Sequence, residues 1–166
     1  MALTRINNNS LSDVTSAGLP EGSVIQVVPY TDSGEYTTQS QSYQQGPQTG
    51  TFTLTNASNK VLVTASFLAE TQRGTGDYPG ARYAIYRGSI ASGTRLTQGT
   101  EPQFLAYGVN DLWGWQTLTF LDTPGGNTTY SIGFNCHLEP STNGGNAQIK
   151  GSYGQTVITM MEIAGA

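Results

Sequence analysis

Residues 23–166 are a series of short strand-like runs separated by turn signals, and this pattern limits the fold more than any other feature. The clearest run is 128–136, in which apolar and polar side chains alternate residue by residue, as in a half-buried strand. It follows the segment 121–127, where Pro124 and Gly125 favour a reverse turn. A chain built in this way folds as strands joined by tight turns.

Several other runs show the same β-type texture. The segment 60–70 is apolar on both faces, so we expect a central strand that is covered on both sides. The segment 35–48 fits either an edge strand or a long loop. Further strands are expected over 23–30, 51–55, 81–87, 103–109, 115–121 and Thr156–Ile163. With eight to ten strands and almost no helix, the sequence predicts an all-β, antiparallel, two-sheet β-sandwich.

The two ends of the chain differ in character. Residues 1–22 are polar and contain no apolar stretch of signal-peptide type, so we interpret them as an N-terminal attachment arm. Residues 23–166 form one head domain. Cys136 is the only cysteine, which excludes an intrachain disulfide and favours folding in a reducing cytoplasm.

Charge is scarce in this chain. Its 7 basic and 11 acidic residues give a net charge of −4, which argues against nucleic acid as a partner. No apolar run approaches the roughly 18 residues that a membrane span requires, so we expect no membrane insertion.

No group of residues forms a recognisable catalytic or metal centre. Cys136 and His137 are neighbours, and neighbouring side chains of a strand point to opposite faces, so they cannot form a dyad. Cys136 continues an apolar face and is expected to be a buried structural residue. A zinc site would need more Cys and His ligands than the chain contains.

Three aspartates and one asparagine in expected loops are the other candidates for chemistry. Their spacing marks no carboxylate pair of glycosidase type. We interpret them as turn formers rather than calcium ligands; they are Asp77, Asn110, Asp111 and Asp122. We therefore expect a protein that is not an enzyme and has no catalytic residue, metal or cofactor, with a small depolymerase as the enzymatic alternative.

Aromatic residues concentrate in the central third of the chain. Tyrosines and tryptophans in loops are adaptable anchors for sugars and other ligands. Trp113 is the best candidate, because it falls in an expected loop between Asp111 and Gly114, and Tyr78 falls in another. We take Trp113, Tyr78 and Asp111 as candidate receptor-binding residues. The alternative is that the aromatic side chains pack in the core or across a trimer axis.

Both ends of the sequence resemble one known group of proteins. The opening LTRINNNSLSDVTSAGLPEGSVIQVV is similar to the start of many bacteriophage fiber and virion structural proteins, especially from marine phages and cyanophages. The closing GQTVITMMEIAGA resembles the last strand of the same group. The texture between them is similar to jelly-roll heads of the tumour-necrosis-factor and C1q type.

The resemblance implies a homotrimeric knob on a virion, assembled in the host cytoplasm. Residues 1–22 would hold another virion protein, and the head would recognise a host surface glycan. The leading hypothesis is therefore a non-enzymatic tail fiber or spike head that attaches to the host. The alternative is a capsid decoration, cement or head-spike protein with a purely architectural role.

Overall fold

A computed structural model describes residues 19–72, 80–97, 103–105, 111–136 and 145–165. Within these ranges the chain forms eleven strands and no helix. They are β1 (Val24–Asp32), β2 (Glu35–Thr38), β3 (Gln44–Gln48), β4 (Lys60–Gln72), β5 (Gly80–Arg87), β6 (Thr94–Arg95), β7 (Gln103–Leu105), β8 (Asp111–Asp122), β9 (Tyr130–Cys136), β10 (Asn146–Lys150) and β11 (Thr156–Ile163).

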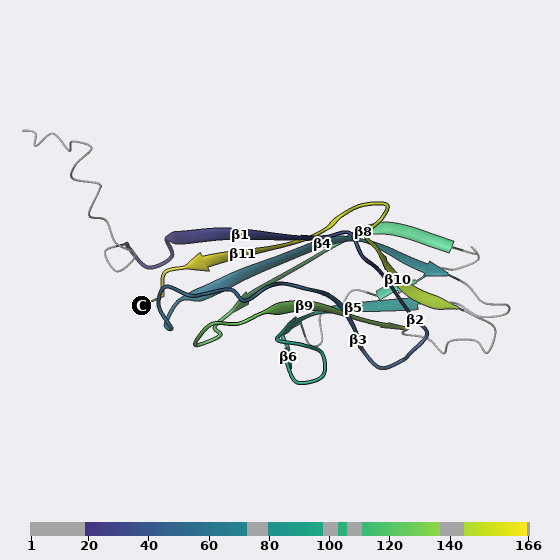
Figure 1. Ribbon diagram of the computed structural model, residues 1–166, viewed down its shortest axis with the longest axis horizontal. Helices are drawn as coiled ribbons and strands as arrows, with labels where there is room; N and C mark the ends of the chain where they lie inside the picture. The colour runs from purple at the N-terminus through teal and green to yellow at the C-terminus, as the bar shows by residue number, and fades with distance from the viewer. Residues whose placement is uncertain (1–18, 73–79, 98–102, 106–110, 137–144, 166) are drawn as a thin grey trace, which may run out of the picture.

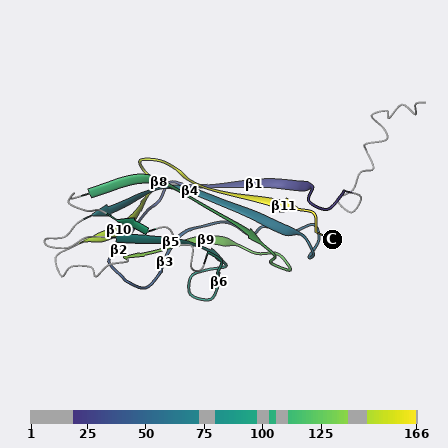
Figure 2. The same ribbon diagram turned by 180° about the vertical axis from the view of Figure 1, so that it is seen from behind.

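The strands form two antiparallel sheets that lie face to face (Figure 1). The first sheet has the order β1-β11-β4-β10-β2, with β8 paired along the free side of β4. The second sheet has the order β3-β9-β5-β6, with β7 also paired to β5. Figure 2 shows the same two layers from behind.

From β3 onward the chain passes repeatedly between the sheets. It enters the first sheet with β4, the second with β5 to β7, the first with β8, the second with β9, and the first again with β10 and β11. The last strand thus lies between β1 and β4, which is the strand order of a jelly roll. The prediction of an antiparallel two-sheet sandwich of jelly-roll type is confirmed.

The core is filled by alternate residues of both sheets. Phe67 of β4 and Tyr83 of β5 meet across the layers with ring centroids 4.9 Å apart, and both are fully buried. The Tyr83 hydroxyl donates a 2.9 Å hydrogen bond to the carbonyl of Gln148, so this buried polar group is satisfied. Cys136 is 4% exposed, as its predicted structural role requires. Burial raises the pKa of its thiol, which keeps the group protonated and unreactive.

Strand β4 is central, as predicted, but the described residues cover only one of its faces. Its inward residues, such as Val63 and Phe67, are buried. The outward side chains of Leu62 and Leu68 stay half-buried, although β4 has partners on both sides. Within the described part of the chain, the expectation of a strand covered on both faces is therefore wrong, because the second sheet packs on the inner face alone.

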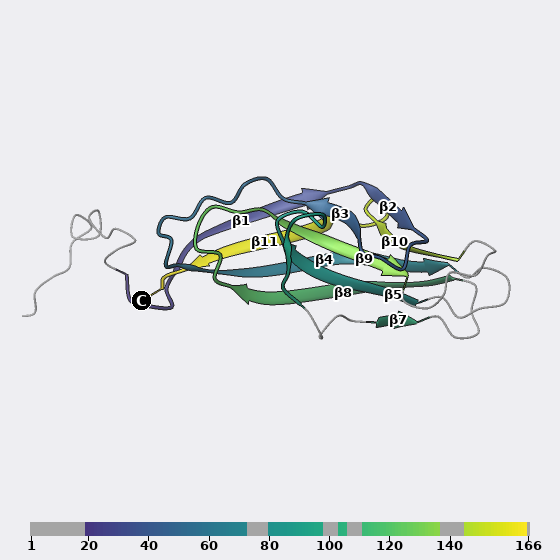
Figure 3. The same ribbon diagram turned by 90° about the horizontal axis from the view of Figure 1, so that it is seen from below.

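The molecule is elongated, and its two ends differ. The start of β1 and the end of β11 lie together at one end, which we call the base (Figure 3). There Gly22 N donates to the Ala164 carbonyl, and Ala164 N donates to that of Ser23. Strand β8 begins at the opposite end, which we call the distal end. The described residues contain no helix long and apolar enough to cross a membrane.

Candidate functional site

The outer face of the first sheet carries the most conspicuous exposed side chains of the molecule. Alternate residues of β8 point outward from this face and are exposed. Among them, Trp113 is 42% exposed, Trp115 is 59% exposed and Leu121 is 50% exposed. Large apolar side chains gathered on one face mark a surface for contacts rather than a solvated strand.

Trp113 lies in a strand and not in a loop, so the expected loop at 110–114 is wrong within its described residues. Asp111 begins β8, and Gly114 pairs with Ala69 of β4 without interrupting the ladder. Pairing with β4 along all twelve residues of β8 outweighs the local preference of Asp and Gly for turns. Because residues two apart in a strand share a face, Asp111 and Trp113 are brought together on the outer face. Tyr78 lies outside the described residues.

The β10–β11 turn folds back over the outer face (Figure 1), and Tyr153 of this turn and Lys150, the last residue of β10, lie against Trp113. Its ring meets Tyr153 edge to face, with centroids 5.1 Å apart and an interplanar angle of 89°. Lys150 Nζ lies over both rings, 5.5 Å from the centroid of Trp113 and 5.3 Å from that of Tyr153. The ammonium therefore holds the two aromatic side chains together by cation–π attraction.

Gly154, the next turn residue, lies against the Trp115 ring. A Cβ at this position would stand 2.7 Å from that ring, so a larger residue would have to displace the Trp115 side chain. Trp115 is opposite Leu68 in the register of β8 and β4. The distal half of the outer face is thus an aromatic cluster, which we define as Trp113, Trp115 and Tyr153.

A closed ring of polar contacts lies beside the aromatic cluster. Lys150 donates to Gln148, Gln148 to Asn146, Asn146 to Gln72, and Gln72 to Glu70, at distances of 3.2, 2.6, 2.9 and 3.0 Å. The ring closes through Glu70 Oε2, which lies 3.5 Å from Lys150 Nζ. Such a network fixes its members in one arrangement, because every link depends on the next.

Electrostatics at this end are dominated by carboxylates. Lys150 Nζ is shared between Glu70 and Glu35, at 3.5 and 3.4 Å. A hydrogen bond from Ser152 and the charge of Lys150 lower the pKa of Glu35 against a smaller opposing effect of desolvation. With Asp111 exposed nearby, the described residues here provide three carboxylates and one ammonium. The described side chains at this end therefore carry a net negative charge.

One polar row crosses three strands at the edge of this cluster. In the register of the first sheet, Asp111 of β8 lies opposite Gln72 of β4, and Gln72 lies opposite Asn146 of β10. We call Asp111, Gln72 and Asn146 the polar row. The sequence did not single out Gln72 or Asn146, because they are 74 residues apart and only the register brings them together.

Toward the base, the outer face becomes apolar. Leu121, Leu62, Met161 and Val27 follow one another across β8, β4, β11 and β1. We call these four residues the apolar row. Between it and the aromatic cluster lies a belt of mostly hydroxyl-bearing side chains, with Thr64 and Thr119 3.4 Å apart.

The outer face of the second sheet is covered by its own chain. Tyr86 of β5 points outward but is only 7% exposed. Its ring contacts Tyr43, with centroids 5.7 Å apart, and Arg95 lies 5.3 Å from the Tyr43 ring. A Cβ at Gly133 would lie 2.6 Å from Tyr86 and 2.8 Å from Ile90, so these side chains rest directly on the strand.

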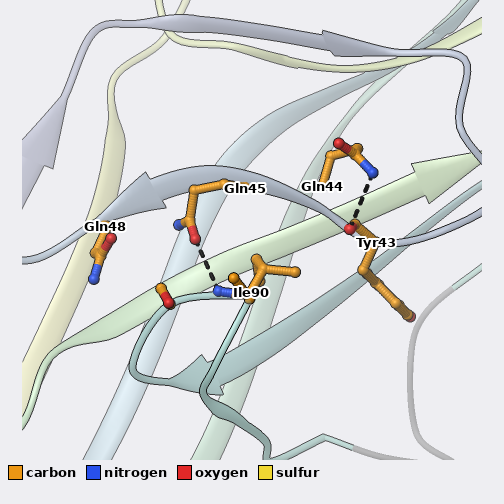
Figure 4. A pocket seen from close by; sticks show the side chains of 7 residues that line it. Tyr43, Gln44, Gln45, Gln48 and Ile90 are labelled. Atoms are coloured by element: carbon orange, nitrogen blue, oxygen red, sulfur yellow. Dashed lines mark hydrogen bonds between the residues drawn. The ribbon is translucent and has the colours of Figure 1, made fainter.

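A shallow hollow of about 460 Å³ remains on this second face, between β3 and the turn after β5 (Figure 4). Its uncharged lining includes three glutamines. Gln45 Oε1 accepts a 2.9 Å hydrogen bond from Ile90 N, and Gln44 donates to the Tyr43 carbonyl at 3.2 Å. These amides hold the chain's own loops in place.

The described residues provide no cluster of metal-ligating side chains. Asp111 and Asp122 are the first and last residues of β8, so they stand roughly 36 Å apart and cannot share an ion. Asp122 is instead a link between the sheets, 3.3 Å from Arg87 and accepting a 3.0 Å hydrogen bond from Tyr130. Asp77, Asn110 and His137 lie outside the described residues.

Comparison with known proteins gives weak matches. No family model matches the chain, and no curated protein does. Among solved structures, the infectious bursal disease virus Gx strain matches with 11% identity and a TM-score of 0.35 over 87% of this chain and 40% of the other. T=1 particles derived from the same virus match with 13% identity and a TM-score of 0.36, over 87% and 38%. The chain spans about two fifths of those chains, and a likeness at this level supports no argument about function.

Proposed function

We propose that this protein is a non-enzymatic structural component of a virion, a homotrimeric head of a bacteriophage fiber or spike that attaches to a host glycan. The observation that carries the proposal is the difference between the two outer faces. One face is covered by the chain's own side chains, whereas the other leaves an apolar row and an aromatic cluster open. A surface of this kind is stabilised by a partner.

Copies of the same chain are the partner that the apolar row fits best. Leu121, Leu62, Met161 and Val27 provide a continuous apolar strip with no charged side chain in it. Burying such a strip against other copies removes apolar area from water without leaving an unpaired charge. Closed rings of identical subunits are the usual outcome of such contacts.

The two ends of the molecule differ, and this difference supports a role in attachment. The described end of the N-terminal segment, residues 19–22, joins the head at the base, where Gly22 and Ser23 are hydrogen-bonded to Ala164. We propose that this arm holds another virion protein. Trp113 and Asp111 then lie toward the distal end, where a host surface would be met. We retain Tyr78 as a third candidate for this contact.

The experiment is competition for adsorption to host cells. Isolated wild-type protein is expected to block adsorption of the phage, and its trimeric form should do so better than a single subunit, because several weak sites act together. Leu121→Asp places a charge in the apolar row and should yield monomers that compete at least about tenfold more weakly. Thr117→Ala, on the same strand and face, is the matched control and should behave as wild type.

An architectural role in decorating or cementing the capsid is the second candidate. The same open face could pack against a capsid shell as readily as against sister subunits. In that case wild-type trimers would leave adsorption unchanged at every concentration. That result would overturn the attachment part of the proposal and favour the capsid role.

A further inference from the structure

We infer that Trp113 and the polar row bind a neutral hexose unit of a glycan, and that acidic sugars are excluded from this site. The inference rests on the proposed function, since it specifies the ligand of the distal surface. It adds Gln72 and Asn146 to the site and defines the class of sugar by charge.

The geometry places an aromatic ring beside a short ladder of hydrogen-bonding groups. Trp113 and Asp111 share the outer face of β8, separated by about 7 Å along the strand. Asp111, Gln72 and Asn146 follow across neighbouring strands at about 4.8 Å per step, which suits successive hydroxyl groups of one sugar. The indole, 42% exposed, provides an apolar surface on which the ring of that sugar can lie.

The amides of the row are held in place before any ligand arrives. Gln72 Oε1 accepts from Asn146 at 2.9 Å, and Gln72 Nε2 donates to Glu70 at 3.0 Å. Asn146 Oδ1 accepts from Gln148 at 2.6 Å. A primary amide has two N–H donors and two acceptor lone pairs. In the described contacts, Gln72 and Asn146 each use one donor and one lone pair, so each keeps one donor and one lone pair for a hydroxyl group of the sugar. Binding therefore costs little side-chain ordering.

Charge decides the class of sugar. Lys150 is the cation that the described residues place at this end of the face, and it lies between Glu70 and Glu35 at 3.5 and 3.4 Å. Its ammonium is also covered by the rings of Trp113 and Tyr153. A sialic acid or uronic acid would meet the Asp111 carboxylate with its own negative charge, whereas a neutral hexose would donate hydroxyl hydrogen bonds to it.

The test uses the full chain on an array of neutral, sialylated and uronate-containing oligosaccharides, followed by titration of the strongest neutral one. Trp113→Ala should weaken binding at least about tenfold, because it removes the aromatic surface on which the sugar ring is proposed to stack. Asp111→Ala should weaken it about threefold to tenfold, and as a change of an exposed residue at the start of a strand it leaves folding intact. Thr117→Ala, on the same strand and face but outside the aromatic cluster, is the control and should bind within about twofold of wild type.

Several outcomes would overturn the inference. They are a preference for acidic oligosaccharides, wild-type binding by both Trp113→Ala and Asp111→Ala, or an equal loss in Thr117→Ala. Solution mass and adsorption competition separate this failure from that of the proposed function. A trimer that blocks adsorption but does not bind neutral sugars would refute only the hexose site. A monomer that binds neutral hexose through Trp113 refutes the trimer alone.

Discussion

The outer faces of the two sheets differ in how far their aromatic side chains are shielded from water. Both carry aromatic side chains, but on the second sheet Tyr86 is 7% exposed beneath Tyr43, whereas on the first sheet Trp115 is 59% exposed. The second face is complete within one chain. The described residues leave the first face uncovered, and we therefore propose it as the surface that contacts partners.

The largest predicted effect comes from removing one aromatic side chain from each face in turn. Tyr86→Ala should lower the free energy of unfolding by about 3–5 kcal/mol, because a buried aromatic ring leaves a cavity beside Tyr43. Trp115→Ala, measured at a concentration low enough to keep the chain monomeric, should change it by less than about 0.5 kcal/mol. Urea unfolding followed by fluorescence measures both. Equal losses in the two variants would mean that the two faces do not differ in how far side chains of the same chain cover them.

A smaller effect concerns the base, where a buried carboxylate ties β1 to the rest of the first sheet. Glu162 is fully buried and accepts hydrogen bonds from Gln26, Thr55 and Asn59, at 2.6–2.9 Å. Burial raises its pKa, but these hydrogen bonds outweigh burial, so the net pKa is lowered. Glu162→Gln should therefore cost about 2–3 kcal/mol of unfolding free energy, because an amide cannot accept from all of these donors.

The lowered pKa of Glu162 also fixes the sign of a pH effect. Its contribution is present above the pKa of the unfolded chain and is lost as the pH falls through the folded-state pKa. Wild-type stability should fall below about pH 4, and Glu162→Gln should show a shallower fall over the same range. Thermal unfolding at a series of pH values measures this. Parallel curves for both proteins would count against a carboxylate held in its charged form.

The smallest predicted effect tests how tightly the second face is covered. A Cβ at Gly133 would stand within 2.6 Å of Tyr86, so Gly133→Ala should lower the free energy of unfolding by about 1–2 kcal/mol through forced displacement of the ring. Gly126, around which a Cβ would meet nothing within 4 Å, provides the control variant Gly126→Ala. A melting temperature of Gly133→Ala that equals that of the control would show a loose cover.

Strands in which apolar and polar residues alternate clearly could be predicted from the sequence. The prediction of Thr156–Ile163 coincides with β11, and the predicted run at 128–136 contains β9. The expected strand at 51–55 is reduced to one bridge between Phe52 and Thr128. The segment 35–48, which read as one edge strand or loop, contains β2 and β3, and these two strands belong to different sheets.

The candidate site could be predicted only in part, for a physical reason. An exposed Trp113 follows from its polar neighbours, but its place in a strand follows from pairing with β4, which local sequence does not reveal. The contacts of Lys150, Gln72 and Asn146 depend on the register between strands far apart in the chain. The sequence likewise could not predict that the outer face of β4 is uncovered. A strand that is apolar on both faces has the same sequence pattern whether its cover comes from one chain or from several.

The most direct measurement of the central claim is the solution mass of the full chain, determined by light scattering across a dilution series. If the apolar row of the first sheet is covered by sister subunits, the mass equals three times the 17.6 kDa of one chain, and Leu121→Asp reduces it to that of a single chain. A wild-type mass of 17.6 kDa at all concentrations would contradict the account.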